Sequence, residues 1–206
     1  SATADVIGAI ELACTDVDAR EVYGAGYASG SAAHATAGSV AITVDGAEVM
    51  IIQGGGQASS GGNADVLGST STTVKNCSNL YGYILGGGDA PGSGTARVGS
   101  SDVIIQNSIV PVDEQFGVLV AAATYAGGSA SGAGSDASVL GSASLRVVDC
   151  EGGGNLYGGG EASGGGRATV GNVRIALTRL SQTEYKGTLY SGSLFAGGES
   201  DDPSAS

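Results

Sequence analysis

The chain has 206 residues and a mass of 19.7 kDa, which fits one domain or one repeat array rather than several modules. It carries 8 Lys and Arg against 20 Asp and Glu, and the net charge of -12 argues against binding to a nucleic-acid backbone. With 39 glycines but only 3 prolines, 41% hydrophobic and 14% charged residues, it is too apolar for a disordered chain and too poor in proline for collagen.

Six copies of one pattern follow one another along the chain. Each copy contains a landmark glycine, usually preceded by an aliphatic residue, and the copies are about 30 residues apart except for one longer interval between the fourth and the fifth. The landmark glycines are Gly8, Gly38, Gly68, Gly99, Gly141 and Gly171. Aliphatic residues alternate after each glycine, and the positions four places after it are Leu12, Ile42, Thr72, Val103, Leu145 and Ile175. This alternation predicts a strand with one buried face in every copy.

Each copy also contains a triad of small residues. The triads begin at Gly24, Gly54, Gly86, Ala121, Gly158 and Ala196. An aliphatic residue stands two places before each triad, which predicts an inward column of Val22, Ile52, Ile84, Leu119, Leu156 and Leu194. Each copy is therefore predicted to run as a strand through the triad, a Gly/Ser turn, a short strand ending at the landmark glycine, a bend and a third strand.

Like columns in successive copies predict stacking into one continuous core. We expect an all-β fold, a right-handed parallel β-helix (β-solenoid) of about six turns with roughly 30–38 residues per turn, over residues 1–198. Residues 199–206 are expected to be a C-terminal tail or linker. The alternative is an antiparallel β-prism or sandwich, in which Gly-rich turns such as residues 59–63 close hairpins.

Three tandem motifs, at residues 22–28 (VYGAGYA), 52–58 (IQGGGQA) and 156–162 (LYGGGEA), carry a family resemblance. They resemble the Gly-rich parallel β-helix repeats of bacterial cell-surface proteins of the adhesin and autotransporter-passenger type. The resemblance implies a non-enzymatic display or adhesion scaffold, extracellular or at the cell surface, and it assigns no functional residues. Because the first residues already lie inside the repeat, we expect neighbouring repeats of a longer parent chain.

Two rows of side chains are predicted to flank the triads on the outer face. One row comprises Tyr23, Gln53, Leu85, Val120, Tyr157 and Phe195, and the other comprises Tyr27, Gln57, Asp89, Thr124, Glu161 and Glu199. Small residues between taller rows predict a shallow groove, in which aromatic rings stack on sugar rings and polar groups bond hydroxyls. The competing interpretation is an ordinary solvated sheet face whose small residues serve packing.

Three longer segments, residues 106–117, 149–155 and 178–192, are predicted to lie along one edge of the solenoid, where they either bind a partner or only cap the rod. The predicted ligand-binding residues are Tyr23, Tyr27, Tyr157, Glu161, Phe195, Glu199, Glu151 and Tyr185. The expected partner is a glycan or a surface protein. Nucleic acid is not expected, and no apolar run approaches the roughly 18 residues of a membrane span.

Glu161 and Glu199 are predicted to lie about 5 Å apart on neighbouring turns, the separation of a retaining glycosidase pair. Adjacent coils give that spacing to any equivalent residues, so a carbohydrate-active enzyme or carbohydrate-binding module is only the alternative to a non-catalytic scaffold. No cofactor and no metal ion is expected. Cys14 is predicted to be a buried hydrophobic residue. Cys77 and Cys150 are expected as free thiols, because one intervening turn separates them by about 9.6 Å, beyond disulfide reach.

Overall fold

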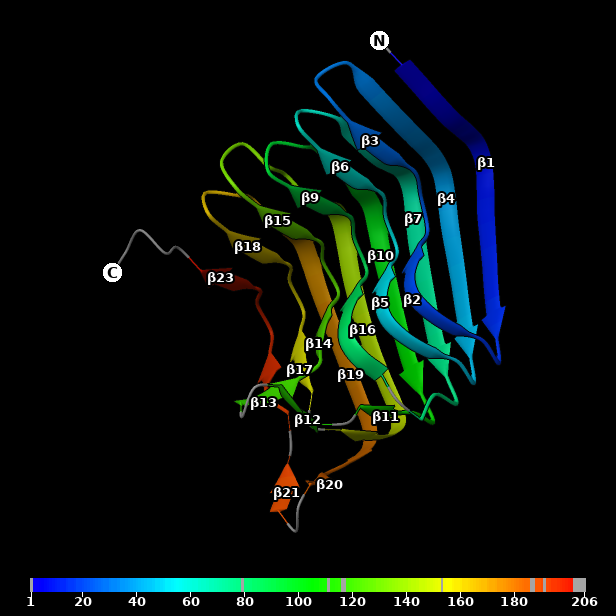
Figure 1. Ribbon diagram of the computed structural model, residues 1–206, viewed down its shortest axis with the longest axis vertical. Helices are drawn as coiled ribbons and strands as arrows, with labels where there is room; N and C mark the ends of the chain where they lie inside the picture. Colours follow the sequence, from blue (N-terminus) through cyan, green and yellow to red (C-terminus); the bar gives the residue numbers. More distant parts are fainter. Residues whose placement is uncertain are drawn as a thin grey trace.

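The computed structural model describes residues 2–78, 80–110, 112–115, 118–152, 154–185, 188–190 and 192–201. These residues contain β-strands and no helix. The strands form three parallel sheets that wind as a right-handed β-solenoid of about five turns, since six strands in a sheet are joined by five steps (Figure 1). The predicted fold class is confirmed.

Each turn contributes one strand to each of three sheets. Sheet A consists of β1 (Ala2–Thr15), β4 (Ala33–Asp45), β7 (Asn63–Lys75), β10 (Val98–Gln106), β16 (Val139–Gly152) and β19 (Val170–Ser181), with the short β11 (Ile109–Val110) paired to β16. Sheet B consists of β2 (Asp18–Tyr23), β5 (Glu48–Gln53), β8 (Leu80–Leu85), β14 (Ala123–Tyr125), β17 (Asn155–Tyr157) and β22 (Leu194–Phe195). Sheet C consists of β3 (Tyr27–Ser29), β6 (Gln57–Ser59), β9 (Asp89–Pro91), β15 (Ser129–Ser131), β18 (Glu161–Ser163) and β23 (Glu199–Asp201).

The predicted ladder of inward residues in sheet A is confirmed. Leu12 pairs with Ile42, Ile42 with Thr72, Thr72 with Val103, Val103 with Leu145 and Leu145 with Ile175, all in parallel register. The bend expected at each landmark glycine is a β-bulge inside one long strand, where the register shifts by a residue between neighbouring strands. Antiparallel pairing occurs only in two inserted hairpins, β12 (Val112–Gln115) with β13 (Val118–Ala121) and β20 (Thr183–Tyr185) with β21 (Thr188–Tyr190), within the described ranges.

The small-residue triad predicted in the fourth copy is wrong. Tyr125 pairs with Leu85, and the amide of Gly86 donates to the carbonyl of Tyr125, so the residues in register with Gly86-Gly87-Gly88 are Ala126, Gly127 and Gly128. The predicted members Ala121, Leu119 and Val120 instead lie in strand β13 of an inserted hairpin. Thr124, predicted on the outer row, occupies the inward column in register with Ile84 and Leu156. The hairpin accounts for the longer interval between copies.

A column of left-handed backbone turns the chain from sheet A into sheet B. Residues at this corner have positive φ in every layer, namely Asp16 (50°), Gly46 (65°), Asn76 (57°), Asn107 (47°), Asp149 (54°) and Arg179 (52°). Asp, Asn and Gly adopt this conformation at least cost. Arg179 is the exception, and its guanidinium bonds Asp149 of the layer before it, with Nη2 2.5 Å from Oδ2.

The small-residue triads press against sheet A and divide the interior into two cores. We call this constriction the waist; it comprises residues 24–26, 54–56, 86–88, 126–128, 158–160 and 196–198. A Cβ on Gly86 would lie 2.8 Å from Cγ2 of Val103, and one on Gly88 would lie 2.7 Å from Cβ of Ala96, so only glycine fits there. Between sheets A and B the core is aliphatic, whereas between sheets A and C it is an alanine core of Ala28, Ala35, Ala58, Ala64, Ala90, Ala96, Ala130 and Ala137.

Two hydroxyl groups tie sheet A to the waist. Thr70 Oγ1 donates to the carbonyl of Gly86 at 2.6 Å, and Ser101 Oγ donates to the carbonyl of Ala126 at 2.5 Å. Both residues are buried, and they are Cα partners in adjacent strands. They satisfy carbonyl groups that the sheet ladders leave inside the protein.

The three cysteines are free, which confirms the prediction for Cys77 and Cys150. Cys77 and Cys150 are buried at the corner after sheet A, and Ser108 lies between them, since its hydroxyl accepts from the amide of Cys77 and its carbonyl accepts from the amide of Glu151. Cys14, predicted to be buried, is only half-buried, because β1 is the edge strand of sheet A and no described layer covers it; its side chain packs against the aliphatic core.

Candidate functional site

The outer surface of the waist carries two rows of side chains that face each other. The aromatic row ends sheet B and contains Tyr23, Gln53, Leu85, Tyr125, Tyr157 and Phe195. The acidic row begins sheet C and contains Tyr27, Gln57, Asp89, Ser129, Glu161 and Glu199. Because the backbone between them is drawn inward onto sheet A, the surface is concave, and outward side chains approach one another across it.

Aromatic rings stack along the first row. Tyr125 and Tyr157 have ring centroids 4.5 Å apart, Tyr157 and Phe195 4.7 Å apart, and Tyr83 of the neighbouring row lies 6.3 Å from Tyr125. Tyr125 is only 2% exposed and Tyr157 6%, in a small apolar cluster with Leu85 and Ala123, while Phe195 at the end of the stack is 43% exposed. The row was predicted as the wall of a groove, but its members Tyr125 and Tyr157 pack against each other and are largely buried.

A hydrogen bond connects two members of the acidic row. Gln57 Nε2 donates to Asp89 Oδ2 at 2.9 Å, and Ser129 stands between Asp89 and Glu161 in the register of sheet C. Burial raises the pKa of Asp89 above its usual range. Burial also raises the pKa of Glu161, and repulsion from Glu199 and Asp89 adds to it. Burial within the row therefore disfavours the charged forms of Asp89 and Glu161.

Glu199 joins the two rows. Its Oε2 accepts a 2.5 Å hydrogen bond from the hydroxyl of Tyr125. Burial, followed by the bond to Glu199, raises the pKa of Tyr125. Glu161 and Glu199 are Cα partners in β18 and β23, as the stacking predicts. The predicted domain boundary at residue 198 precedes β23, and residues 202–206 of the expected tail lie outside the described residues.

The concave surface is open at its first turn. A hollow of about 350 Å³ is lined by Glu21, Tyr23, Ala25, Gly26, Tyr27 and Gln57. Further along, side chains fill the concavity, because Gln53 reaches across to donate to the carbonyl of Gly56 at 2.6 Å and the tyrosine stack covers the next layers. Of the predicted binding residues, Tyr23 and Tyr27 share this hollow, whereas Tyr157, Glu161, Phe195 and Glu199 lie together at the other end of the same surface.

The two remaining predicted residues lie elsewhere. Glu151 is half-buried in β16, beside Ile109 and Ser181, at the edge that carries the inserted hairpins. Tyr185 ends β20 and pairs with Thr188, and its side chain falls outside the described part of the structure. Lys186 of the same predicted edge is not among the described residues. The structure thus separates this edge from the waist surface.

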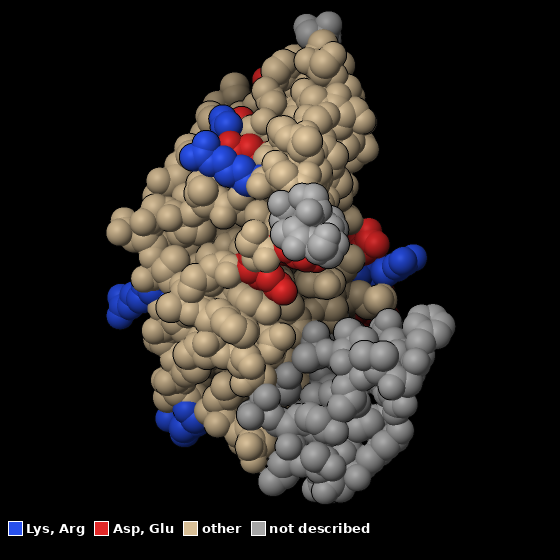
Figure 2. Space-filling view, turned by 90° about the vertical axis from the view of Figure 1, so that its left-hand side faces the viewer, with Lys and Arg blue, Asp and Glu red and all other residues tan. Residues whose placement is uncertain are grey.

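The charges on the waist surface have one sign. The four outward rows in register with Glu21, Tyr23, Tyr27 and Ser29 contain Glu21, Asp89, Glu161, Glu199 and Asp201, and among their residues there is no Lys or Arg. Figure 2 faces the left-hand side of Figure 1; one group of red Asp and Glu atoms lies near the middle of that face, and other red atoms lie next to blue Lys and Arg atoms at the upper left and at the right-hand edge. The surface therefore favours neutral or cationic ligands over anionic ones.

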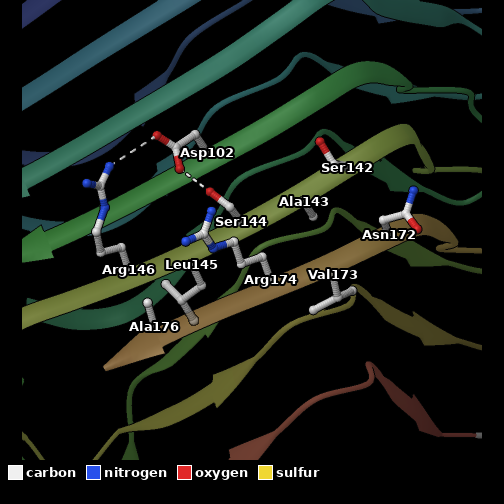
Figure 3. A pocket seen from close by; sticks show the side chains of 10 residues that line it. All are labelled: Asp102, Ser142, Ala143, Ser144, Leu145, Arg146, Asn172, Val173, Arg174 and Ala176. Atoms are coloured by element: carbon white, nitrogen blue, oxygen red, sulfur yellow. Dashed lines mark hydrogen bonds and ion pairs between the residues drawn. The ribbon is translucent and has the colours of Figure 1, made fainter. Parts of the chain in front are cut away.

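A second hollow, of about 430 Å³, lies on sheet A where β16 and β19 meet (Figure 3). Asp102 accepts a hydrogen bond from Ser144 and forms an ion pair with Arg146 at 3.8 Å, and Arg174 lies beside Ser144. This hollow contains no aromatic side chain, so it offers no flat surface on which a sugar ring can stack.

Sequence reasoning missed three members of the waist surface. Tyr125 and Ser129 were hidden by the misplaced fourth triad, although Ala130, four places after Ala126, continues the alanine column and would have revealed the shift. Glu21 lies two residues before Tyr23, outside the two rows that directly flank the triads. Its row is outward by the same period-two rule that placed Tyr23.

Comparison of the chain with protein-family models, curated proteins and solved structures found no match. Within the described residues, no cluster of three or more His, Cys, Asp or Glu side chains is arranged to hold a metal ion. The described part of the chain also has no helix long and apolar enough to cross a membrane.

Proposed function

We propose that this chain is a non-catalytic scaffold domain of a bacterial cell surface, which extends as a rod and presents the concave waist surface to a glycan. The observation that carries the proposal is the parallel register of the aromatic row and the acidic row along the waist. The exposed aromatic rings of Tyr23, Tyr27 and Phe195 suit the apolar faces of sugar rings, and carboxylates, amides and hydroxyls suit their hydroxyl groups. The surface location rests on the resemblance of the repeats to adhesin-type β-helices.

A glycan array, followed by calorimetric titration of the intact chain with the best ligand, tests this proposal. We expect binding that weakens at least several-fold in Phe195→Ala and in Glu161→Gln, both on the waist surface, and that is unchanged in Glu11→Gln, on the exposed outer side of β1. Failure to bind any glycan, or binding insensitive to both waist variants, would contradict it.

The alternative of a carbohydrate-active enzyme is favoured by one observation, the pairing of Glu161 with Glu199 on adjacent strands. However, the hydroxyl of Tyr125 occupies Oε2 of Glu199, and Glu199 is the more exposed of the two carboxylates. Chromatography of each bound glycan after prolonged incubation decides the matter. Release of shorter sugars by the wild-type chain, abolished in Glu161→Gln and Glu199→Gln, would replace the scaffold with an enzyme.

A further inference from the structure

The hollow in the first turn presents two aromatic faces on a floor of small residues. Tyr23 ends β2 and Tyr27 begins β3, and the intervening residues are Gly24, Ala25 and Gly26. Tyr23 is 36% exposed and Tyr27 62%, in contrast to the buried tyrosines of the central stack. A volume of about 350 Å³ lies within the range of small-ligand sites.

Hydrogen bonds at the hydroxyl groups hold both rings in place. The Tyr23 hydroxyl donates to Oε2 of Glu21 at 2.8 Å, and the Tyr27 hydroxyl lies 3.1 Å from Oγ of Ser59, which in turn donates to Ser29. Because both hydroxyl groups are already hydrogen-bonded, the faces of the two rings are the groups available to a ligand in the hollow. Fixed aromatic faces attract cations through the ring quadrupole.

The electrostatic environment of the hollow also favours a cation. Glu21 lines it, and the nearby Asp89 fixes the Gln57 amide by accepting from Nε2, which leaves Oε1 of Gln57 as an acceptor. The hydrogen bond to Glu21, with burial and the charges of Glu21 and Asp89, raises the pKa of Tyr23 to about 12 against the opposing charge of Arg20. The basic neighbour, Arg20, is 80% exposed and lies 3.5 Å from Glu21, a solvated pair that competes weakly.

We propose that this hollow binds the protonated amine of an amino sugar, with the ammonium group between Tyr23 and Tyr27 and within reach of Glu21. The inference rests on the proposed glycan-binding function and names the ligand class: glycans that carry free, unacetylated amino groups. The charge of the waist surface has the matching sign along its whole length, so successive amino sugars of one chain meet carboxylates again at Asp89, Glu161 and Glu199.

Two oligosaccharides with the same backbone test the ligand class. The intact 206-residue chain is titrated in a calorimeter with a glucosamine hexamer and with an N-acetylglucosamine hexamer, which differ in the charge of each residue. We expect the glucosamine hexamer to bind at least tenfold more tightly, and its affinity to fall with added salt and with a pH above the pKa of the sugar amine. Equal affinity for the two hexamers would overturn the inference.

Variants locate the site. The double substitution Tyr23→Leu and Tyr27→Leu, and separately Glu21→Gln, should each weaken binding of the glucosamine hexamer about tenfold. Glu11→Gln, which removes the same charge from the outer side of β1 in the same turn, should leave it unchanged. Glu21→Gln keeps a side chain able to bond Tyr23, so it preserves the local fold; wild-type affinity in that variant and in the tyrosine pair would refute the site.

A sugar-free probe separates this inference from the proposed function. Tetramethylammonium chloride, titrated against the wild-type chain, should shift the NMR signals of the Tyr23 and Tyr27 rings, and the shifts should disappear in Glu21→Gln. If the chain binds neutral glycans but neither the glucosamine hexamer nor tetramethylammonium, the ammonium site is wrong and the glycan function stands. If it binds tetramethylammonium but no glycan, the glycan function is wrong, the hollow is still a cation site, and the amino-sugar assignment is refuted.

Discussion

The hydroxyl of Tyr125 lies 2.5 Å from Oε2 of Glu199, although Tyr125 belongs to β14 and Glu199 to β23, two layers further along the solenoid. The ring of Tyr157, in the intervening layer, stacks on that of Tyr125. Three successive layers are therefore linked on the outer surface by contacts independent of the backbone ladders.

Removing this hydroxyl should loosen the last layer. In Tyr125→Phe we expect the free energy of unfolding to fall by about 1 kcal/mol, since a hydrogen bond to a charged group is lost while Glu199 regains water. Urea denaturation measures the change, and hydrogen exchange at residues 199–201 should speed up. The matched control is Tyr83→Phe, whose half-exposed ring makes no hydroxyl hydrogen bond within the described residues. Equal loss in both variants would contradict a role for the Glu199 bond.

Gly87, at the middle position of the waist, should tolerate no side chain, because the next layer covers it. A Cβ on Gly87 would lie 2.8 Å from the amide nitrogen of Gly128, so Gly87→Ala should destabilise the protein by about 1–3 kcal/mol. Gly197 occupies the equivalent position in the last layer, and its Cβ would meet nothing within 4 Å, so Gly197→Ala should leave the unfolding midpoint nearly unchanged. Similar effects at the two positions would mean that the clash between layers is not what selects glycine.

Two threonines of β7 should respond in opposite directions to the same substitution. Thr72 is fully buried, and within the described part of the chain its Oγ1 has no hydrogen-bond partner, so Thr72→Val should raise stability by about 1 kcal/mol. Thr70, also buried, donates to the carbonyl of Gly86, so Thr70→Val should lower stability by about 1–2 kcal/mol. Thermal unfolding of the two variants checks the signs, and a loss of stability in Thr72→Val would show that its hydroxyl has a partner.

Because of the acidic row, we expect the free energy of unfolding to rise as the pH falls. Burial, with repulsion from Glu199 and Asp89, raises the pKa of Glu161 above its ordinary 4.5, so the folded state binds the proton more tightly than the unfolded chain. The destabilisation of the folded state by ionised Glu161 is therefore full above the raised pKa. It diminishes as the pH falls through that pKa and is absent below 4.5.

Glu161→Gln should remove this dependence. At neutral pH we expect it to raise the free energy of unfolding by about 1 kcal/mol or less, because the carboxyl is only half-buried. Urea titrations at a series of pH values compare it with Glu11→Gln, which changes net charge equally. If both variants have the same pH dependence, the local repulsion is not its source.

Regular stacking made much of this architecture predictable from the sequence. Leu12, Ile42 and Val103 lie in one ladder because parallel pairing repeats the same spacing in every layer. The fourth triad failed because Ala121 and its neighbours satisfy the requirement for small residues, while a hairpin inserted before β14 moves the true waist to Ala126. The local amino-acid composition does not show which of several small residues is covered by a neighbouring layer.

The sequence predicted which residues form the outward rows of the candidate site, but not how deeply their side chains are buried. Period-two alternation places Tyr157 on the outside, as it places Tyr23, yet the first is buried and the second borders an open hollow. The difference depends on how far outward side chains converge across a concave bend. The length of Gln53 and the stacking of Tyr125 on Tyr157 fill the later layers, and these are contacts between turns that no single repeat contains.

The ladders between layers also determine how such a rod responds to tension. Their hydrogen bonds point along the solenoid axis, so a pull that separates the first layer from the last loads them directly and peels coils away one at a time. A layer contributes about 4.8 Å to the folded rod, whereas its roughly 30 residues span about 100 Å when drawn straight. Each coil that unfolds is therefore about twenty times longer when extended than the height it occupied in the solenoid. The rod lengthens in discrete steps, and each step dissipates part of a sudden load before the next layer unfolds.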